Sequence, residues 1–361
     1  MGMFLQRKQI NAFGRLAKLV DSGDTQLLAC CNELEGATAV HEFPYIYAAV
    51  LLANRRRLLE AISFLERCES NTFASKLCQY LKECGVFAPR AVTFADSRPY
   101  DIYTRTGLYK EYLAGAKAAI MAFVDKNPQP VSSSRFSILD IGTGNGVFIT
   151  EIINCIAAKN GACRCKLIVL DQSQAMHAAA EEYIKLHAKL DVETVHIYSK
   201  IQDIAPELLP ALLGEEPIWF INAGLSVHHM PDTVKINMLK NLSVVAEHFL
   251  LTDMSGNHDL PEKDSPELVY SIVCTYDRYF KAVVGADLTE ADKQLCIYDF
   301  WLAEALTMLS CERPQRIDYH ATIKQWGEYA GKAGYEVVNL IPTTYCGDDP
   351  LNFTMHLRVK E

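Results

Sequence analysis

The stretch from Asp140 to Gly146 places an acid before three glycines at alternate positions, in the order Asp-Ile-Gly-Thr-Gly-Asn-Gly. Apolar residues precede it and a helix-compatible run, residues 149–158, follows it, so the pattern predicts a strand, a tight turn and a helix. Glycines permit backbone conformations with positive φ and let a ligand lie against the main chain. The helix that follows offers N–H groups to a carboxylate or a phosphate. This stretch therefore indicates a site for a nucleotide-containing cofactor.

The spacing of the glycines distinguishes between two kinds of cofactor. The dinucleotide pattern G-x-G-x-x-G requires a glycine where this chain has Val147, so an NAD-dependent oxidoreductase is disfavoured. The pattern D-x-G-x-G-x-G instead resembles the first motif of class I S-adenosylmethionine-dependent methyltransferases. The resemblance covers residues 100–361. It implies that the loop 142–146 holds the methionine moiety and that Asp140 supports the methionine amino group, directly or through water.

Polar residues also follow the next predicted strands, where ligands of open α/β sheets bind. The resemblance implies that Asp171 binds the ribose, that Asp203 binds the adenine and that residues 218–224 lie beside the sulfonium. The adenine-stacking residue is left open between Gln172 and Met176. The predicted cofactor-binding residues are Asp140, Gly142, Gly144, Gly146, Asp171, Gln172, Gln202, Asp203 and Asn222.

The segment 222–232 contains the main candidate for a catalytic base. It resembles the histidine-containing segment after the fourth strand of small-molecule methyltransferases, in which a histidine followed four residues later by an aspartate is the general base. His228 and Asp232 have that spacing. The alternative is that this histidine packs or caps the following helix. His258, after the fifth predicted strand, is the second catalytic candidate, and His229 is predicted to contact the substrate.

A metal-dependent alternative uses some of the same residues. His228, His229, His258 and Asp253 could converge as two histidines and one carboxylate, a known ligand set for iron. Some microbial α-keto acid C-methyltransferases resemble this scheme. Nothing in the spacing requires an ion, so no metal is predicted.

The elements that must position these residues alternate in type from residue 136 onward. Strands are predicted at 136–141, 166–170, 194–198, 218–222, 249–253, 335–341 and 352–359. Helices fit between the strands except between the last two, which predicts an antiparallel closing pair. The predicted fold class is α/β: a seven-stranded doubly wound sheet with an antiparallel last strand, an N-terminal all-helical lobe, and a helical insertion after the fifth strand.

Two domains are predicted, a helical lobe at 1–95 for dimerisation or as a lid, and a methyltransferase domain at 96–361 with a helical insertion at 260–319. Helices are predicted in the lobe at 4–20, 27–34, 44–65 and 73–81, with a linker at 88–99. The insertion is rich in aromatic residues, of which Tyr276, Tyr279 and Trp301 are predicted to bind the substrate as part of a lid. The alternative of equal weight is that they form extra core.

Composition limits the partners and the setting. The 361 residues carry a net charge of −9 and no long basic block, which disfavours nucleic acid. The N-terminus lacks the charged, apolar and small-residue regions of a signal peptide in their usual order, and no apolar run is long enough to span a bilayer. No membrane partner is therefore predicted. The twelve cysteines form no C-x-x-C pair and fit small buried residues in a reducing cytosol, which predicts a cytoplasmic protein. A homodimer is also predicted.

These observations predict an enzyme that transfers a methyl group from S-adenosylmethionine to a small-molecule acceptor. O-methylation with a histidine base is favoured, and C- or N-methylation, with or without a metal, is the first alternative. The typical motif of base and glutamine N-methyltransferases, D/N-P-P-Y/F, is missing after the fourth predicted strand. The alternative from another class is a catalytically inactive scaffold of the methyltransferase fold.

Overall fold

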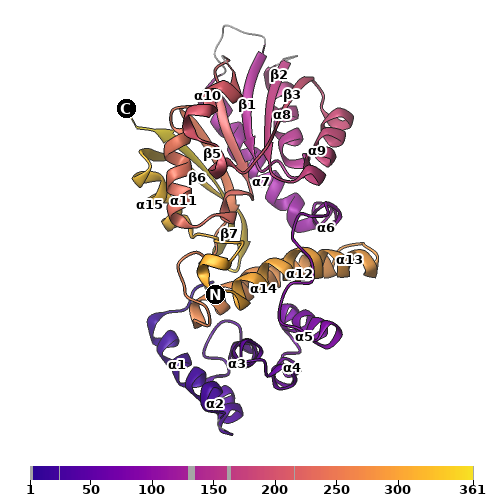
Figure 1. Ribbon diagram of the computed structural model, residues 1–361, viewed down its shortest axis with the longest axis vertical. Coiled ribbons are helices and arrows are strands. Elements are labelled where there is room, and N and C mark those ends of the chain that lie inside the picture. The colour runs from indigo at the N-terminus through magenta and orange to yellow at the C-terminus, as the bar shows by residue number, and fades with distance from the viewer. Residues whose placement is uncertain (1–2, 24, 129–134, 161–163, 215, 361) are drawn as a thin grey trace. The chain divides into compact units, whose positions relative to one another are not determined.

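The computed structural model of this chain describes residues 3–23, 25–128, 135–160, 164–214 and 216–360 (Figure 1). The chain divides into two compact units. The helical unit comprises Met1–Thr93, Gly256–His320 and Tyr345–Asp349, and the sheet unit comprises Phe94–Ser255, Ala321–Thr344 and Pro350–Glu361. Among the described residues, none of the helices combines the length and the apolar character that crossing a bilayer requires.

One seven-stranded sheet organises the sheet unit. Its strands are β1 (Arg135–Ile141), β2 (Arg164–Asp171), β3 (Asp191–Tyr198), β4 (Phe220–Gly224), β5 (His248–Met254), β6 (Tyr335–Cys346) and β7 (Asp349–Val359). They lie in the order β3-β2-β1-β4-β5-β7-β6, and β7 runs antiparallel to β5. The predicted fold class is confirmed, because β1 to β5 pair in parallel and the antiparallel strand is the last.

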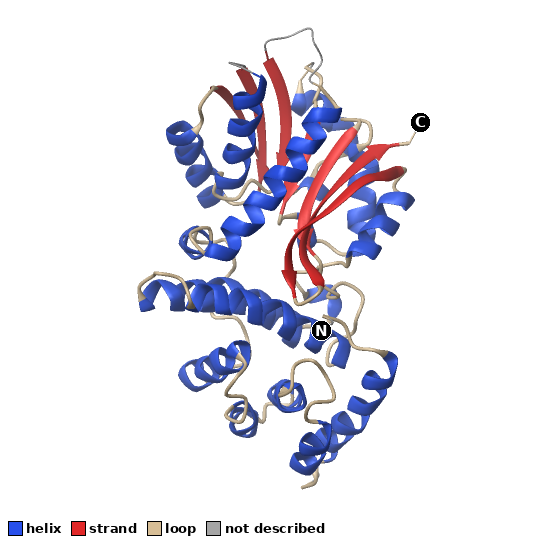
Figure 2. Cartoon of the chain, turned by 180° about the vertical axis from the view of Figure 1, so that it is seen from behind, coloured by secondary structure: helices blue, strands red, loops and turns tan. Residues whose placement is uncertain are grey.

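Helices cover both faces of this sheet (Figure 2). They are α6 (Arg98–Tyr103), α7 (Gly107–Lys126), α8 (Val147–Asn160), α9 (Gln174–His187), α10 (Leu209–Leu213), α11 (Asp232–Leu242) and α15 (Ile323–Lys332). Alternate side chains of β1 point to opposite faces. Leu139 and Ile141 join a core with Trp326 of α15, whereas Phe123 of α7 packs edge-on against Phe220 at a ring distance of 5.4 Å.

The helical unit combines the N-terminal helices with the insertion. Its helices are α1 (Arg7–Ser22), α2 (Leu27–Leu34), α3 (Phe43–Asn54), α4 (Leu58–Leu65), α5 (Thr72–Cys84), α12 (Pro266–Val284), α13 (Glu290–Cys296), the π-helical η4 (Ile297–Trp301) and α14 (Leu302–Ser310). Ring pairs join the two parts: Tyr270 of α12 lies 4.9 Å from Phe43, and Phe280 lies 5.5 Å from Phe73. The insertion therefore shares one core with α3 and α5.

Two local predictions in the N-terminal part are wrong. The helix predicted at 44–65 is two helices, α3 and α4, separated by a turn in which Arg56 has a φ of +61°. The apolar spacing continues through both helices and therefore does not reveal this break. The linker predicted at 88–99 ends earlier than expected, because α6 begins at Arg98.

Candidate functional site

The carboxyl ends of four parallel strands bring the predicted cofactor residues of the sheet unit together. In the register of the sheet, Asp140 of β1 pairs with Val169 of β2 on one side and with Asn222 of β4 on the other. Gly224, at the end of β4, pairs with Thr252 of β5. The loops that follow β1, β2, β4 and β5 therefore leave the same edge of the sheet, where α/β proteins bind their ligands.

The glycine loop between β1 and α8 has the backbone that the sequence predicts. Gly142, Gly144 and Gly146 have φ values of +68°, +57° and +79°. A Cβ atom on Gly142 would lie 2.2 Å from Cβ of Ser226, and one on Gly146 would lie 2.9 Å from Cα of Ala180 in α9. These glycines are thus required by both backbone conformation and close packing.

Asp171, at the end of β2, is hydrogen-bonded to this loop. Its Oδ2 accepts from the backbone N–H of Gly144 at 3.2 Å, and its Oδ1 accepts from that of Ser173 at 2.8 Å. An ionised carboxylate has about four acceptor sites, so two remain for further donors. The side chain is half-buried, and Gln172 beside it is exposed.

Asp140 lies deeper and is held by Asn222. The Nδ2 of Asn222 donates to Oδ1 of Asp140 at 2.6 Å, and both residues are buried. Burial raises the pKa of Asp140 to about 6, although the hydrogen bond from Asn222 opposes this rise. Asn222, predicted as a cofactor contact, therefore reaches the acid next to the glycine loop.

Gln202 and Asp203, the other two predicted cofactor residues, lie in the short helix η1 (Ile201–Asp203) that follows β3. Both side chains are exposed. Their place after β3 agrees with the predicted position, and their role stays a prediction.

The loop after β4 is fixed by three local features. The backbone N–H of Leu225 donates to the carbonyl of Thr252 at 2.8 Å, and Leu225 has a φ of +52°, which is unfavourable for a branched side chain. The hydroxyl of Ser226 donates to the carbonyl of Ile141 at 2.6 Å. This loop leads directly into the helical turn η3 (Val227–His229), so its geometry sets the position of both histidines.

His228 forms a buried pair with a carboxylate from β5. Its Nδ1 lies 2.7 Å from Oδ1 of Asp253, and the two side chains are 3% and 0% exposed. The same carboxylate oxygen accepts from the backbone N–H of Met254 at 2.8 Å. A carboxylate at Nδ1 fixes the ring so that Nδ1 carries the proton and Nε2 carries the basic lone pair. The sequence pattern pairs His228 with Asp232 and includes Asp253 only as a candidate metal ligand.

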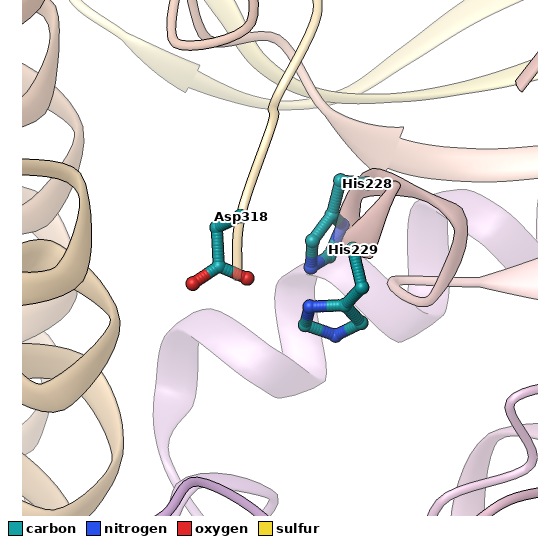
Figure 3. Close-up of side chains that lie close together, drawn as sticks. All are labelled: His228, His229 and Asp318. Carbon is teal, nitrogen blue, oxygen red and sulfur yellow. The ribbon is translucent and has the colours of Figure 1, made fainter. Parts of the chain in front are cut away.

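His229 lies beside His228. Their ring centroids are 4.3 Å apart, and Figure 3 shows the two imidazoles next to one another on the loop. His229 also contacts the ring of Phe94 at 5.4 Å. Asp318, the third labelled residue of Figure 3, belongs to the helical unit.

The segment 94–103 covers the glycine loop, a role that the sequence pattern does not predict. The ring of Tyr100 lies 3.3 Å from the point where a Cβ atom on Gly144 would stand. Asp101 accepts a hydrogen bond from Asn145 at 2.8 Å. This segment begins in the predicted linker. The only sequence feature that could have indicated its role is its group of aromatic residues.

The same segment also reaches the loops after β2 and β4. The carbonyl of Phe94 accepts from the hydroxyl of Ser173 at 3.0 Å, and its ring contacts Tyr100 at 6.1 Å and His229 as described above. Phe94 has a φ of +65°, an uncommon conformation for an aromatic residue. The segment 94–103 thus links the three loops that carry the predicted cofactor and catalytic residues.

The aromatic residues predicted to bind substrate lie buried in the helical unit. Tyr276 and Tyr279 are fully buried and Trp301 is 1% exposed. Tyr279 stacks on Trp301 at 4.1 Å, and the hydroxyl of Tyr276 donates to Glu304 at 3.2 Å. Such packing is typical of core residues, the second interpretation of the insertion, and a role in substrate binding stays a prediction.

His258, the second catalytic candidate, is also in the helical unit. It is fully buried, and its backbone N–H donates to the carbonyl of His320 at 2.9 Å. The two imidazole rings lie 5.1 Å apart. The metal hypothesis that joins His258 to His228 combines residues of two units and remains a hypothesis.

Comparisons with known proteins identify the fold. No protein-family model and no curated protein matches the chain. The crystal structure of SCL7 from Oryza sativa is similar over 96% of this chain and 99% of that chain, with 13% identity and a TM-score of 0.65. The chain shares its fold with SCL7. At this identity the likeness describes the fold alone.

Methyltransferases are also among the similar structures. The magnesium protoporphyrin IX methyltransferase of Synechocystis PCC 6803 with bound S-adenosylhomocysteine covers 72% of this chain and 94% of its own, with 9% identity and a TM-score of 0.43. The O-methyltransferase NcsB1 from neocarzinostatin biosynthesis covers 68% and 57%, with 11% identity and a TM-score of 0.34.

Proposed function

We propose that the sheet unit binds S-adenosylmethionine at the carboxyl ends of β1 to β3 and that the protein transfers the methyl group to a small-molecule acceptor. The observation that carries the proposal is the glycine loop 142–146, whose three glycines have positive φ angles and whose Gly144 N–H donates to Asp171. O-methylation is favoured because a histidine suited to proton removal follows β4.

The residues present fit this cofactor. The ribose offers two hydroxyl donors, and the Asp171 carboxylate retains acceptor sites after its two backbone hydrogen bonds. The methionine moiety carries an ammonium group, and Asp140 is an acid held beside the glycine loop by Asn222. The bound sulfonium supplies an electrophilic methyl group with a neutral leaving group.

The protein must then align the acceptor and remove its proton. We assign proton removal to Nε2 of His228, because the Asp253 carboxylate at Nδ1 places the basic lone pair there. The negative charge of Asp253 also stabilises the imidazolium that forms when His228 takes the proton. In this proposal His229 and Phe94 contribute to the wall of the acceptor site.

Calorimetry with the full chain tests the cofactor. S-adenosylmethionine and S-adenosylhomocysteine should both bind, and Asp171→Ala should weaken binding by about 10- to 150-fold, because hydrogen bonds to a charged group contribute about 1.5–3 kcal/mol. Asp191→Ala is the matched control, since Asp191 is an exposed aspartate at the beginning of β3, the opposite end of the sheet.

Two results would contradict the proposal. Binding of NADH without a response to either sulfur nucleoside would favour the oxidoreductase. Failure of every one of these nucleotides to bind would favour the inactive scaffold of the same fold.

A further inference from the structure

A compact group of metal-ligating side chains lies inside the helical unit. Glu304 of α14 is 1% exposed, and Asp318 and His320, from the segment that leads out of the insertion, are fully buried. Each offers one ligand atom, a carboxylate oxygen or an imidazole nitrogen, and these three atoms lie within 4.8 Å of one another. The sequence motifs include none of these three residues.

The two acids of this group are buried close together. Two such carboxylates disfavour each other's ionisation, and burial together with Asp318 raises the pKa of Glu304 well above its usual range. The hydroxyl of Tyr276 donates to Glu304. A divalent cation between the carboxylate oxygens would favour their ionised forms.

The arginines of the same segment bind other groups. Arg313 pairs with the Asp259 carboxylate at 2.8 Å, and Nη1 of Arg316 donates to the carbonyls of His258 and Pro261 at 3.2 and 2.9 Å. Their guanidinium groups thus stabilise the backbone around the group of three residues.

The backbone that carries His320 is held rigidly. Its carbonyl accepts from the N–H groups of His258 and Asp259 at 2.9 and 3.0 Å. A Cβ atom on Gly256 would lie 2.8 Å from the His258 ring and 3.0 Å from Cβ of His320, so this close packing requires a glycine. Rigid positioning of the ligands is a general requirement of metal sites.

We propose that Glu304, Asp318 and His320 bind one divalent transition-metal ion. Carboxylate oxygens together with an imidazole nitrogen suit Mn²⁺, Fe²⁺ or Zn²⁺, and a double positive charge balances two carboxylates. Three protein ligands leave at least one position for water or for an oxygen atom of a ligand, as in catalytic metal sites. This inference concerns the helical unit and does not depend on methyl transfer.

Mn²⁺ binding by the full chain tests the proposal. Mn²⁺ is the best probe because thiolates, of which this chain has twelve possible sources, prefer softer ions. After treatment with EDTA and its removal, the protein should bind one Mn²⁺ per chain in calorimetry and in Mn²⁺ electron paramagnetic resonance. Glu304→Gln should weaken binding by about 100-fold or more, since loss of even an outer partner of a ligand costs about 10- to 100-fold.

Glu290→Gln is the matched control, because Glu290 is an exposed acid of the same unit with a side chain 87% accessible. Wild-type Mn²⁺ affinity in Glu304→Gln would overturn the proposal. It would indicate that Glu304 and Asp318 share a proton and bind no metal ion. If that variant does not fold, the wild type still decides. Its melting temperature should rise on addition of Mn²⁺ after EDTA treatment, and the lack of a rise at millimolar Mn²⁺ would equally overturn the proposal.

Discussion

His228 and Asp253 show how the fold builds a candidate catalytic pair from distant positions. They are separated by 25 residues and come from the loop after β4 and from β5, yet lie 2.7 Å apart. The sequence pattern around His228 was sufficient to select this histidine. It was not sufficient to select its partner, because the pairing depends on β4 and β5 being neighbours in the sheet.

Replacement of this pair should separate catalysis from cofactor binding. If His228 is the base, His228→Ala should reduce methyl transfer by about 10²- to 10⁴-fold. Asp253→Asn should reduce kcat as well, because an amide stabilises the imidazolium less than a carboxylate does. The affinity for S-adenosylmethionine, measured by calorimetry, should stay within a few-fold in both variants.

His187→Ala is the control for these variants, because His187 is exposed at the end of α9. Near-wild-type kcat of His228→Ala at neutral pH would show that His228 is structural. The candidate chemistry would then be methylation of a carbon atom, or proton removal by another base.

Asp140 should make stability depend on pH. Its pKa is about 6 in the folded protein and near 3.9 in an unfolded chain, so folding favours the neutral acid. The stability that neutral Asp140 contributes is full below about pH 4 and is lost as the pH rises through 6. The loss approaches about 3 kcal/mol.

Asp140→Asn tests this dependence, because an asparagine keeps an oxygen that can accept from Asn222 and carries no charge. The melting temperature of Asp140→Asn minus that of the wild type should increase from pH 4.5 to pH 7.5. The same difference for Asp191→Asn should stay constant. The same change should weaken cofactor binding if Asp140 supports the ammonium group. An unchanged melting difference across this pH range would refute the raised pKa of Asp140.

At the scale of elements, the glycine loop and the histidine loop fit together at one point. Gly142 has space for Ser226 only because it lacks a Cβ atom, and Ser226 in turn bonds to the carbonyl of Ile141. The sequence motif predicted that Gly142 lets the backbone adopt a positive φ and lets a ligand lie against the main chain. It could not predict this second role, because the contact with Ser226 joins positions 84 residues apart in the chain.

Gly142→Ala should therefore disturb the histidine loop. The substitution combines the strain of a positive φ, about 1 kcal/mol, with a contact of 2.2 Å. We expect a loss of unfolding free energy of several kcal/mol in denaturant titrations, and Ser226→Gly should restore part of it in the double variant.

Gly23→Ala is a matched control for strain alone, because Gly23 has the same φ of +68° and, among the described residues other than its chain neighbours, none has an atom within 4 Å of its expected Cβ position. Equal losses in Gly142→Ala and Gly23→Ala, without rescue by Ser226→Gly, would show that the two loops are not coupled.

At the scale of the whole molecule, the sequence predicted the individual helices and strands better than it predicted which of them pack together. Strand–helix alternation and the missing helix before β7 predicted a doubly wound sheet with an antiparallel last strand, because periodicity reports local structure and local burial. The same information could not show that α12 packs against α3 and α5, since the apolar face of a helix does not identify the helix that covers it. The segment 94–103 was likewise missed, because its contacts are set by the loops that it covers.

Removal of the N-terminal helices should expose the core of the insertion. In a chain that begins at Phe94, Tyr270 and Phe280 of α12 lose their partners Phe43 and Phe73. We expect such a chain to aggregate and to bind a hydrophobic dye, as measured by light scattering and ANS fluorescence against the full chain. A soluble truncated chain with wild-type methyl transfer would show that these helices are dispensable.

The helical unit is discontinuous in the chain, and this has a consequence during synthesis. Residues 1–93 leave the ribosome about 160 residues before Gly256–His320, which complete their core. Synthesis at about 5–20 residues per second leaves the apolar faces of α3 and α5 without α12 for roughly 10–40 s. The nascent chain therefore exposes the apolar surface of an incomplete helical core while the sheet is being translated. Chaperone occupancy of these N-terminal helices should be highest in that interval.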